Sequence, residues 1–335
     1  MKHILITGVC GFIGFHLARR LLSEGRRVVG VDNLNPYYDV VLKESRLSLL
    51  EESGLEFIRG DLTRRDLVLD LIEKGGFETV VHLAAQAGVR HSLVDPYSYL
   101  ESNLSGLFPL LEGCRNNPVR HLLFASSSSV YGGECRVPFS EHQPVDHPVS
   151  LYAATKRSGE LLTHAYSLLY GIPTTALRFF TVYGPWGRPD MAYYCFTKLI
   201  LEGRPIDVYN FGEMRRDFTY IDDIIDGVVR IMSRAPKPDP LWDGKSPDPA
   251  SGRAPFRIYN IGRGKPVELM RFIEILESAL GKRAAKNLLP MQKGDVVETF
   301  ADIDDLKRDT GFEPKVTVEE GIERFVKWYR EYHCV

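Results

Sequence analysis

The sequence predicts an α/β fold in which helices cover both faces of a doubly wound parallel sheet. Short, continuous apolar runs alternate with helical patterns through the first half of the chain. Such runs are typical of parallel strands buried on both faces, whereas one-sided strands alternate apolar and polar residues. We expect strands at 3–7, 27–31, 55–59, 79–83, 120–125 and 174–179, and a first helix at 12–23.

The second half of the chain is less regular and indicates a smaller C-terminal domain. Residues 181–218 are rich in proline, glycine and aromatic residues, which is typical of a region built from loops. Prolines recur between residues 234 and 256 and predict a surface loop there. Helical patterns return at 267–280 and 318–332.

Composition excludes several classes of function. With 42 Lys and Arg against 44 Asp and Glu among 335 residues, the formal net charge is −2. The chain therefore lacks the basic surface expected of a protein that binds nucleic acid or an anionic membrane. No apolar run approaches the roughly 18 residues of a transmembrane helix. Residues 1–8 lack the long apolar segment and cleavage site of a signal peptide, so we do not expect one.

The 5 cysteines are scattered along the chain, and no two of them form a CxxC motif. We interpret Cys10, Cys114, Cys135, Cys195 and Cys334 as reduced thiols of a cytoplasmic protein, not as disulfide or zinc ligands. No His, Cys or Asp grouping has the spacing of metal ligands, so we expect no metal. The histidines at 82 and 121 fall in expected strands and are interpreted as structural.

A glycine-rich loop, GVCGFIG at 8–14, follows the first expected strand and opens the first expected helix. Gly8, Gly11 and Gly14 permit a tight turn and a close approach of the backbone to a pyrophosphate, which a helix N-terminus attracts. The spacing is GxxGxxG rather than GxGxxG, and the position directly after a strand makes the signal specific. The loop predicts a Rossmann-type domain that binds a dinucleotide.

Two aspartates refine the choice of dinucleotide. Asp32 ends the second expected strand, where a carboxylate binds both ribose hydroxyls of NAD and repels the 2′-phosphate of NADP. The alternative is that Asp32 only closes a turn. Asp61 and Leu62 follow the third strand and can meet the adenine ring, although Asp61 can also cap a helix at 62–73. We expect an NAD-binding Rossmann domain at 1–180, joined by segments near 217–232 and 256–263, and a mainly substrate-binding domain at 181–335 with a Pro-rich loop at 234–256.

Hydroxyl groups and a tyrosine–lysine pair form the candidate catalytic group. SSSSVYG at 126–132 places serines at the carboxyl end of an expected strand. Tyr152 and Lys156 are spaced i, i+4, which puts a phenol and an ammonium on one face of a helix. A nearby cation lowers the pKa of a phenol, about 10 when unperturbed, so that it can act as a base. The alternatives are a serine-rich turn and two solvated helix residues, but the order of these segments after a nucleotide loop favours catalysis.

Together these segments resemble the extended short-chain dehydrogenase/reductases of the NAD-dependent epimerase/dehydratase family. Within it the chain is most similar to the nucleotide-sugar epimerases that act on UDP-glucuronate at C4. The resemblance covers nearly the whole chain. Further segments that carry it are VDNLNPYYDVVLKESRL at 31–47, HLAAQAGVRHS at 82–92, HPVSLYAATK at 147–156, RFFTVYGPWGRPDM at 178–191 and MRRDFTYIDD at 214–223.

The resemblance implies a role for each matching residue. Tyr152 would remove the proton of the sugar 4-hydroxyl, and Lys156 would hold the nicotinamide ribose and lower the pKa of Tyr152. Ser127 would bind the same sugar oxygen, with Ser129 close by. Cofactor contacts are implied at Gly8, Gly11, Phe12, Ile13, Gly14, Asp32, Asn33, Asn35, Asp61, Leu62, Leu83, Ala84, Ala85, Gln86, Asn103, Tyr152 and Lys156.

The resemblance also places the substrate. Arg188 would lie near the sugar carboxylate, which a guanidinium binds through two parallel hydrogen bonds. Arg90 is a second candidate, and either arginine can instead serve an interface or the pyrophosphate. Gln292-Lys293 stand where many relatives specific for neutral sugars carry an arginine, so the diphosphate would depend more on Arg216. Substrate contacts are implied at Arg90, Ser127, Ser128, Tyr152, Thr181, Arg188, Val208, Tyr209, Arg216 and Asp295.

The implied activity interconverts UDP-glucuronate and UDP-galacturonate. NAD⁺ takes the C4 hydride, the 4-keto sugar turns within the site, and the hydride returns to the opposite face. Because the ketone is β to the C6 carboxylate, a UDP-glucuronate decarboxylase is the main alternative, but such enzymes usually carry Glu where this chain has Ser129. The 4,6-dehydratases carry Asp-Glu in place of Ser128-Ser129, and a non-catalytic NAD(H)-sensing protein typically loses Tyr152 or Lys156.

Finally, the resemblance implies a homodimer that pairs helices at 95–114 and 150–170 in a four-helix bundle. We expect apolar contacts there, unless these side chains face the sheet of their own subunit. The candidate residues are Leu104, Leu107, Leu111, Leu161, Leu162, Leu168 and Leu169.

Overall fold

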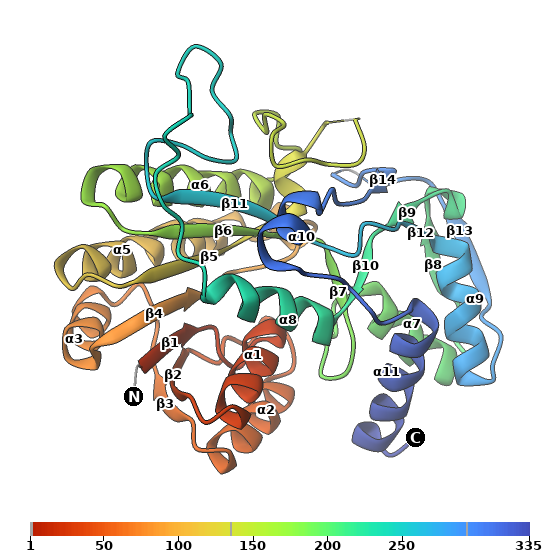
Figure 1. The fold of residues 1–335 in the computed structure, drawn as a ribbon. Coiled ribbons are helices and arrows are strands. Elements are labelled where there is room, and N and C mark those ends of the chain that lie inside the picture. The colour runs from red at the N-terminus through yellow and green to blue at the C-terminus, as the bar shows by residue number, and fades with distance from the viewer. Residues whose placement is uncertain (1–2, 135, 293) are drawn as a thin grey trace.

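A parallel sheet of seven strands forms the centre of the molecule (Figure 1). The computed structural model describes residues 3–134, 136–292 and 294–335. The strand order is β11–β6–β5–β4–β1–β2–β3, so strands are added in opposite directions on the two sides of β1. This confirms the predicted doubly wound α/β fold. The strands are β1 His3–Thr7, β2 Arg27–Asp32, β3 Glu56–Arg59, β4 Phe77–His82, β5 His121–Ser127, β6 Thr174–Phe179 and β11 Phe256–Ile261.

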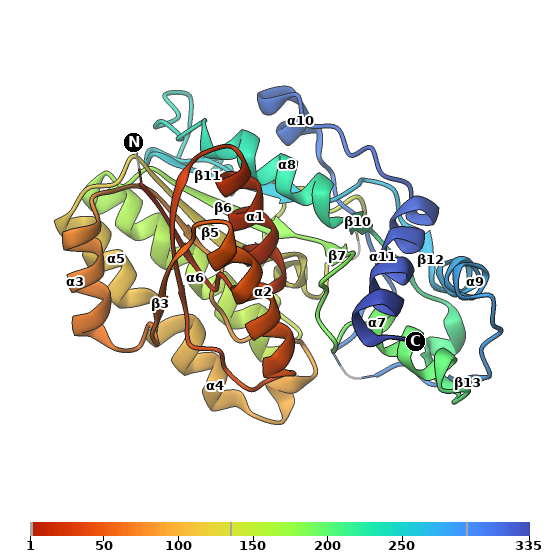
Figure 2. The same cartoon turned by 90° about the horizontal axis from the view of Figure 1, so that it is seen from below.

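Helices cover both faces of the sheet because alternate residues of its strands point to opposite sides. In β1, Ile4 and Ile6 belong to one apolar cluster and Leu5 to the other. The first cluster includes side chains of α1 (Phe12–Ser23), α2 (Val40–Glu52) and α8 (Ile221–Met232). The second is covered by α3 (Arg65–Gly75), α5 (Leu107–Asn116) and α6 (Leu151–Tyr170), and Figure 2 shows the sheet between the two layers.

The single helix predicted over 95–114 is wrong, because a π-helical turn interrupts it. α4 covers Pro96–Leu100, the π turn covers Glu101–Ser105, and α5 follows. The wider turn contains Asn103, whose side-chain amide donates to Gln86 O at 3.0 Å and to Thr155 Oγ1 at 3.0 Å. The irregular turn therefore connects this segment to the loop after β4 and to α6.

Several leucines predicted to meet a partner subunit face the core of this subunit instead. Leu107 and Leu111 are buried in the cluster beneath α3 and α5, and the partly buried Leu162 packs against it. Helical spacing alone does not show which face of an amphipathic helix meets the sheet, and for these three leucines the structure favours the alternative stated above, that they face the sheet of their own subunit. Leu161, Leu168 and Leu169 are exposed, at 54%, 54% and 68%.

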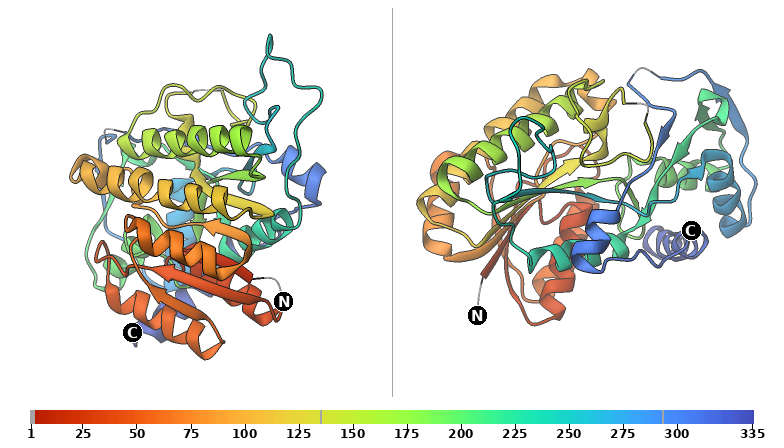
Figure 3. Two further views of the ribbon diagram at one scale, coloured as in Figure 1. Left: turned by 90° about the vertical axis from the view of Figure 1, so that its left-hand side faces the viewer. Right: turned by 45° about the horizontal axis from the view of Figure 1, so that its top comes forward.

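The C-terminal part is built from short strands and helices beside the sheet (Figure 3). The prediction that 181–218 is a region of loops is wrong: α7 (Ala192–Leu201) lies there and buries Tyr193, Phe196 and Ile200. These large side chains supply the packing that stabilises a helix beside proline- and glycine-rich turns. The remaining elements are β7 Thr181–Tyr183, β8 Ile206–Tyr209, β9 Arg215–Arg216, β10 Phe218–Tyr220, β12 Val267–Glu268, α9 Leu269–Leu280, β13 Lys286–Leu289, β14 Glu298–Thr299, α10 Asp304–Thr310 and α11 Val318–His333.

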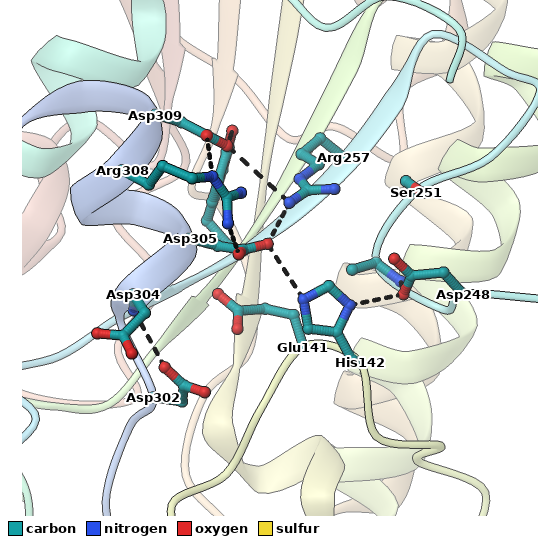
Figure 4. A network of polar contacts seen from close by, with 12 residues as sticks. Glu141, His142, Asp248, Ser251, Arg257, Asp302, Asp304, Asp305, Arg308 and Asp309 are labelled. Atoms are coloured by element: carbon teal, nitrogen blue, oxygen red, sulfur yellow. Dashed lines mark hydrogen bonds and ion pairs between the residues drawn. The ribbon is translucent and has the colours of Figure 1, made fainter. Parts of the chain in front are cut away.

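The Pro-rich segment between α8 and β11 contains no helix or strand, as predicted for a loop. A polar network contacts this loop at Asp248 (Figure 4). There His142 Nδ1 lies 2.8 Å from Asp248 Oδ1 of the loop, and His142 Nε2 lies 3.2 Å from Asp305 Oδ2 of α10. Arg257 of β11 also pairs with Asp305. The division of the chain into two domains near residue 180 stays a prediction.

Candidate active site

A large cavity opens at the carboxyl ends of the parallel strands, between the sheet and the C-terminal part. Its lining follows successive strand ends: Gly8 after β1, Asp32 at the end of β2, Asp61 after β3 and Leu83 after β4. Arg188, Arg216 and Asp295 line the same cavity from the C-terminal part. Parallel α/β sheets bind ligands at this edge, next to the point where the strand order reverses.

The glycine loop is closely packed at the end of β1. A Cβ atom on Gly14 would lie 2.2 Å from Gly8 O, so only glycine fits there without a shift of the backbone. Gly8 has φ +71°, and a Cβ atom on it would lie 2.7 Å from Ala84 N. Gly11 precedes α1 and makes no side-chain cap, which leaves the N-terminus of this helix to a ligand. Phe12 and Ile13 line the cavity as well.

Asp32 closes a turn and also lines the cavity. Its carboxylate accepts hydrogen bonds from Cys10 N at 3.0 Å and from Leu34 N at 2.8 Å. A carboxylate has about four acceptor positions, so these bonds leave capacity for ribose hydroxyls. The two interpretations of Asp32 are therefore compatible.

Asp61 does not cap a helix over 62–73, because α3 begins at Arg65 and is preceded by Arg64. Instead its carboxylate accepts from Thr63 N at 2.9 Å and from Asn33 Nδ2 at 2.7 Å. Burial raises the pKa of this carboxyl, but the hydrogen bonds from Thr63 and Asn33 outweigh burial and lower it. Asp61, Leu62, Asn33 and Asn35 all line the cavity.

The loop after β4 forms the next part of the wall through Leu83, Ala84, Ala85 and Gln86. Asn103 does not line the cavity. Its Oδ1 accepts from Gln86 N at 2.8 Å and its Nδ2 donates to Gln86 O, so it holds the loop from behind. Its predicted direct contact with the cofactor stays a prediction.

The candidate catalytic hydroxyls lie together at the end of β5. Ser127 Oγ accepts from Ser129 Oγ at 3.0 Å and from Ser129 N at 3.2 Å. Tyr152, on the first turn of α6, hydrogen-bonds Ser127. Ser127, Ser128, Ser129 and Tyr152 line the cavity, so the structure brings the predicted serine cluster and tyrosine together.

Burial and neighbouring groups act on the pKa of Tyr152 in opposite directions. Burial raises the pKa of Tyr152, and the charge of Arg188 is the strongest influence that lowers it, followed by the hydrogen bond from Ser127. Lys156 Nζ lies 6.0 Å from the centre of the Tyr152 ring. Its Nζ donates to Ala125 O at 2.8 Å, and burial together with Arg188 lowers the pKa of Lys156 to about 7. The predicted effect of Lys156 on the pKa of Tyr152 stays a prediction.

Glu160 and Arg178 form a buried ion pair next to the candidate catalytic residues, and the sequence analysis missed it. Glu160, one turn after Lys156, accepts from Arg178 Nε at 2.8 Å and from Arg178 Nη2 at 3.0 Å. Ser126 Oγ donates to Glu160 Oε1 at 2.6 Å. Burial raises the pKa of Glu160, and the Arg178 guanidinium more than offsets it, so the carboxylate stays charged. The i, i+4 spacing of Lys156 and Glu160 was the sequence signal that could have shown Glu160 on the same helix face as the predicted catalytic residues.

Arg188 lines the cavity, but part of its guanidinium already has a partner. Its Nε lies 3.0 Å from Asp190 Oδ1 and its Nη2 lies 2.6 Å from Asp190 Oδ2. Tyr37, which also lines the cavity, donates to Asp190 Oδ2 at 3.2 Å. Asp190 and Tyr37 stood in segments that carried the resemblance, yet neither was assigned a role.

Arg90 and Tyr209 lie next to the cavity rather than in its lining. Arg90 Nη2 pairs with Asp295 Oδ2 at 3.1 Å, and its guanidinium lies 4.7 Å from the centre of the Tyr209 ring. Val208 is fully buried in β8. Arg216 donates to Val297 O at 2.9 Å and to Val296 O at 2.5 Å, so it holds the segment that follows Asp295. Thr181 lines the cavity, and the substrate contacts of all these residues stay predictions.

The predicted structural histidines are buried and bonded within the sheet. His82 Nδ1 lies 2.8 Å from Thr7 Oγ1, and His121 Nε2 lies 2.8 Å from Thr175 Oγ1. Within residues 3–134, 136–292 and 294–335, no group of three His, Cys, Asp or Glu side chains could hold a metal ion. No helix in the same ranges is both long and apolar enough to cross a membrane. Four cysteines are free thiols: Cys10, Cys114, Cys195 and Cys334. Cys135 and Lys293 lie outside the described residues.

The fold and the cavity define a dinucleotide-binding enzyme of the extended short-chain class. The chain belongs to the NAD dependent epimerase/dehydratase family, which it matches over residues 4–262. The predicted family is thus confirmed, and with it NAD as the cofactor.

Individual relatives match along the whole chain. An uncharacterized 37.6 kDa protein of Escherichia coli O111:H- is 55% identical over 335 residues, covering 100% of both chains. The probable UDP-glucuronate 4-epimerase of Rhizobium meliloti (strain 1021) is 51% identical over 327 residues, covering 97% of this chain and 96% of that protein. The crystal structure of UDP-glucuronic acid 4-epimerase from Bacillus cereus in complex with UDP-glucuronic acid and NAD matches with a TM-score of 0.87 and 34% identity, covering 99% and 100%.

Proposed function

We propose that this chain is an isomerase that interconverts UDP-glucuronate and UDP-galacturonate through a transient 4-keto sugar. The observation that carries the proposal is that Ser127, Tyr152, Lys156 and Arg188 line one cavity with the glycine loop. The names of the Rhizobium meliloti and Bacillus cereus relatives support the same activity.

NAD fits the residues that are present. The uncapped N-terminus of α1 can receive a pyrophosphate, and Asp32 and Asp61 face the same cavity for the adenosine end. When bound, NAD⁺ supplies a hydride acceptor and a cationic nicotinamide ring. The buried Lys156 lies where it can bind the ribose of that half of the cofactor.

Tyr152 is the proposed base for the sugar 4-hydroxyl. Its burial favours the neutral phenol, and nearby positive charge together with the Ser127 hydrogen bond favours the phenolate. Ser127 is placed to bind the same sugar oxygen, since it already bonds the phenol. As the keto sugar forms, Tyr152 holds the proton, and it returns the proton when the C4 hydroxyl is restored on the opposite face.

The C6 carboxylate must be held so that the 4-keto acid does not lose CO₂. Ser128, Ser129 and Arg188 are the groups proposed to bind it, since all three line the cavity. Ser128 and Ser129 carry no carboxyl group, so this wall lacks the acid that a decarboxylase or a 4,6-dehydratase would use there. Hydrogen bonds to a carboxylate stabilise its charged state and oppose its conversion to neutral CO₂.

The nucleotide would occupy the C-terminal side of the cavity. Arg216 and Asp295 are proposed to meet the diphosphate and ribose, with Thr181 bordering the uracil end, and all three line the cavity. Val208 and Tyr209 are not part of that lining, and their contact with the uracil stays a prediction. We assign this region, mainly residues 181–335, to the substrate and residues 1–180 to the cofactor.

We propose a homodimer in a cytoplasmic location. α6 exposes Leu161, Leu168 and Leu169, and α5 exposes Phe108 at 43%. An apolar stripe on two adjacent long helices matches a four-helix bundle with a second copy. Free buried thiols such as Cys10 and Cys114 agree with a reducing compartment. Light scattering on a sizing column tests the mass of the assembly.

Proton NMR of the purified protein with UDP-glucuronate, without added NAD, tests the activity. Formation of UDP-galacturonate without a pentose product is the expected result and indicates a retained cofactor. A UDP-pentose or UDP-4-keto-pentose signal would instead identify a decarboxylase. No reaction after addition of NAD⁺ and other UDP-sugars, with NAD binding proven, would support an NAD(H)-sensing protein.

A further inference from the structure

Asp190 is a carboxylate bound to Arg188, the arginine proposed above to bind the sugar carboxylate. It engages the Nε and Nη2 atoms of Arg188 in a two-point contact, at 3.0 and 2.6 Å. The side chains of Arg188 and Asp190 are 23% and 27% exposed, so solvent screens the pair only in part. Arg188 keeps its Nη1 protons and one Nη2 proton for a ligand, because a guanidinium has five donors.

A second contact fixes the position of Asp190. The Tyr37 hydroxyl donates to Asp190 Oδ2 at 3.2 Å, from a segment that lies far from Asp190 in sequence. The Tyr37 ring lies 4.7 Å from the ring of His91, which in turn lies 6.1 Å from Tyr99. These contacts join the cofactor side of the cavity to the loop that carries Arg188 and Asp190.

The pair also sets the charge near the reaction centre. Arg188 alone would present a full positive charge to the sugar, whereas Arg188 with Asp190 is neutral overall. Burial lowers the pKa of Arg188, but the contact with Asp190 more than reverses this and keeps the guanidinium charged. An anionic ligand that binds Arg188 is therefore attracted by the guanidinium and repelled by the Asp190 carboxylate bound to it.

We propose that Asp190 is a positioning residue that holds Arg188 by one edge and limits how strongly the site attracts the sugar carboxylate. This rests on the function proposed above, because it takes a uronate as the ligand. Asp190 thereby weakens the preference for a charged sugar over a neutral one, and it keeps substrate and product from being bound too tightly to leave.

The test compares three ligands on the NAD-loaded protein by titration calorimetry: UDP, UDP-glucose and UDP-glucuronate. Asp190→Asn keeps the shape of the side chain and removes its charge. We expect the Kd of UDP-glucuronate to fall about tenfold, because the nearby anion is lost, while the Kd values of UDP and UDP-glucose change less than about twofold. A merely structural role would weaken all three ligands alike, and that result would overturn the proposal.

Two further variants keep the test decisive if Asp190→Asn is unstable. Tyr37→Phe removes the hydroxyl that disperses the charge of Asp190, so UDP-glucuronate should bind about twofold more weakly, opposite in sign to Asp190→Asn. Asp70→Asn removes a carboxylate from an exposed pair with Lys74 and should leave the three Kd values unchanged. A Tyr37→Phe protein that binds UDP-glucuronate more tightly would contradict the proposal.

The pH profile of kcat gives an independent readout. The charged or titratable groups that act on or lie near Tyr152 are Arg188, Asp190, Lys156, Tyr37 and Tyr99. Asp190 raises the pKa of Tyr152, so Asp190→Asn should move the acidic limb of the profile to lower pH. An unmoved limb with unchanged ligand preference would refute the role of Asp190. Failure of the wild-type protein to epimerise UDP-glucuronate would instead refute the proposed function.

Discussion

The side chains on the two sides of the cavity, the sheet side and the C-terminal side, are fixed in place by different kinds of contact. On the sheet side, Lys156 and Glu160 are buried and belong to one helix, and each is fixed by a neighbouring strand at 2.8 Å. On the C-terminal side, Asp295 pairs with Arg90, a 55% exposed side chain that comes from the distant loop after β4. The difference teaches that the reacting groups rest on one helix–strand unit, whereas the proposed nucleotide contacts are assembled from segments that are far apart in the sequence.

The largest expected effect tests whether the sheet side performs the chemistry. Tyr152→Phe removes the phenol oxygen but keeps the ring. We expect epimerisation to slow by about 10⁴-fold, because no other group replaces the base, while bound NAD is retained. Turnover by NMR and NAD content after denaturation measure the two outcomes. A rate within tenfold of wild type would show that the reacting group lies elsewhere.

The next largest effect concerns stability on the same side. Glu160→Gln leaves Arg178 buried without a counter-charge, so the free energy of unfolding should fall by about 3 kcal/mol. Urea denaturation followed by circular dichroism measures the change. Glu202→Gln is the matched control, because Glu202 pairs with Arg204 at the surface and its loss should cost less than about 1 kcal/mol. Equal effects of the two variants would mean that the buried pair does not stabilise the sheet side.

Acid should destabilise the sheet side through His82. Burial, with a smaller effect from Lys156, lowers the pKa of His82 to about 3 from its ordinary value of 6.5. Between these values the unfolded chain binds a proton that the folded chain does not. The free energy of unfolding therefore falls as the pH drops below 6.5, by about 1.4 kcal/mol per pH unit for this group. His82→Gln should make that slope shallower.

The network of Figure 4 should respond to pH in the opposite sense through Glu141. Burial raises the pKa of Glu141 to about 7 from its ordinary value of 4.5, although Asn260 N donates to its carboxyl at 2.6 Å. Here the folded chain holds the extra proton, so this contribution to stability is present at low pH and is lost as the pH rises through 7. Glu141→Gln should flatten the slope between pH 5 and 7, and an unchanged slope would contradict the assignment.

The smallest effect tests the C-terminal side. Arg216→Gln removes a cavity-lining charge and loosens the segment after Asp295, so UDP should bind about tenfold more weakly. Arg215→Gln is the matched control, because Arg215 pairs with Glu298 and does not line the cavity. Calorimetry with UDP separates the two, and equal losses would show that Arg216 acts only through the fold.

Much of the sheet side was predictable from sequence because its residues follow strands directly. The glycine loop, the serines after β5 and the pair Tyr152–Lys156 were all placed by local spacing, and the structure brings them to one cavity. The partners of Arg188 were not predictable in this way. Its contact with Asp190 is local, but the contact of Asp190 with Tyr37 joins two loops that only the folded chain brings together.

The errors have a similar origin. Helix α7 was missed because proline and glycine at its flanks hid a helix stabilised by buried aromatic residues. The sequence left open whether Leu107 and Leu111 face a partner or their own sheet, because periodicity gives the width of an apolar stripe, not the surface that it covers.

The π-helical turn at Glu101–Ser105 acts as a phase shift between two stretches of helix. Each residue of an α-helix advances the side chains by about 100°, so a turn that contains one residue more than usual rotates everything before it relative to everything after it. That rotation lets α5 keep its apolar side on the sheet while Asn103 turns toward Gln86 and Thr155. Deletion of one residue there would change the composition of the chain very little. With a regular helix, however, either α5 would lose its packing on the sheet or Asn103 would lose its contacts with Gln86 and Thr155.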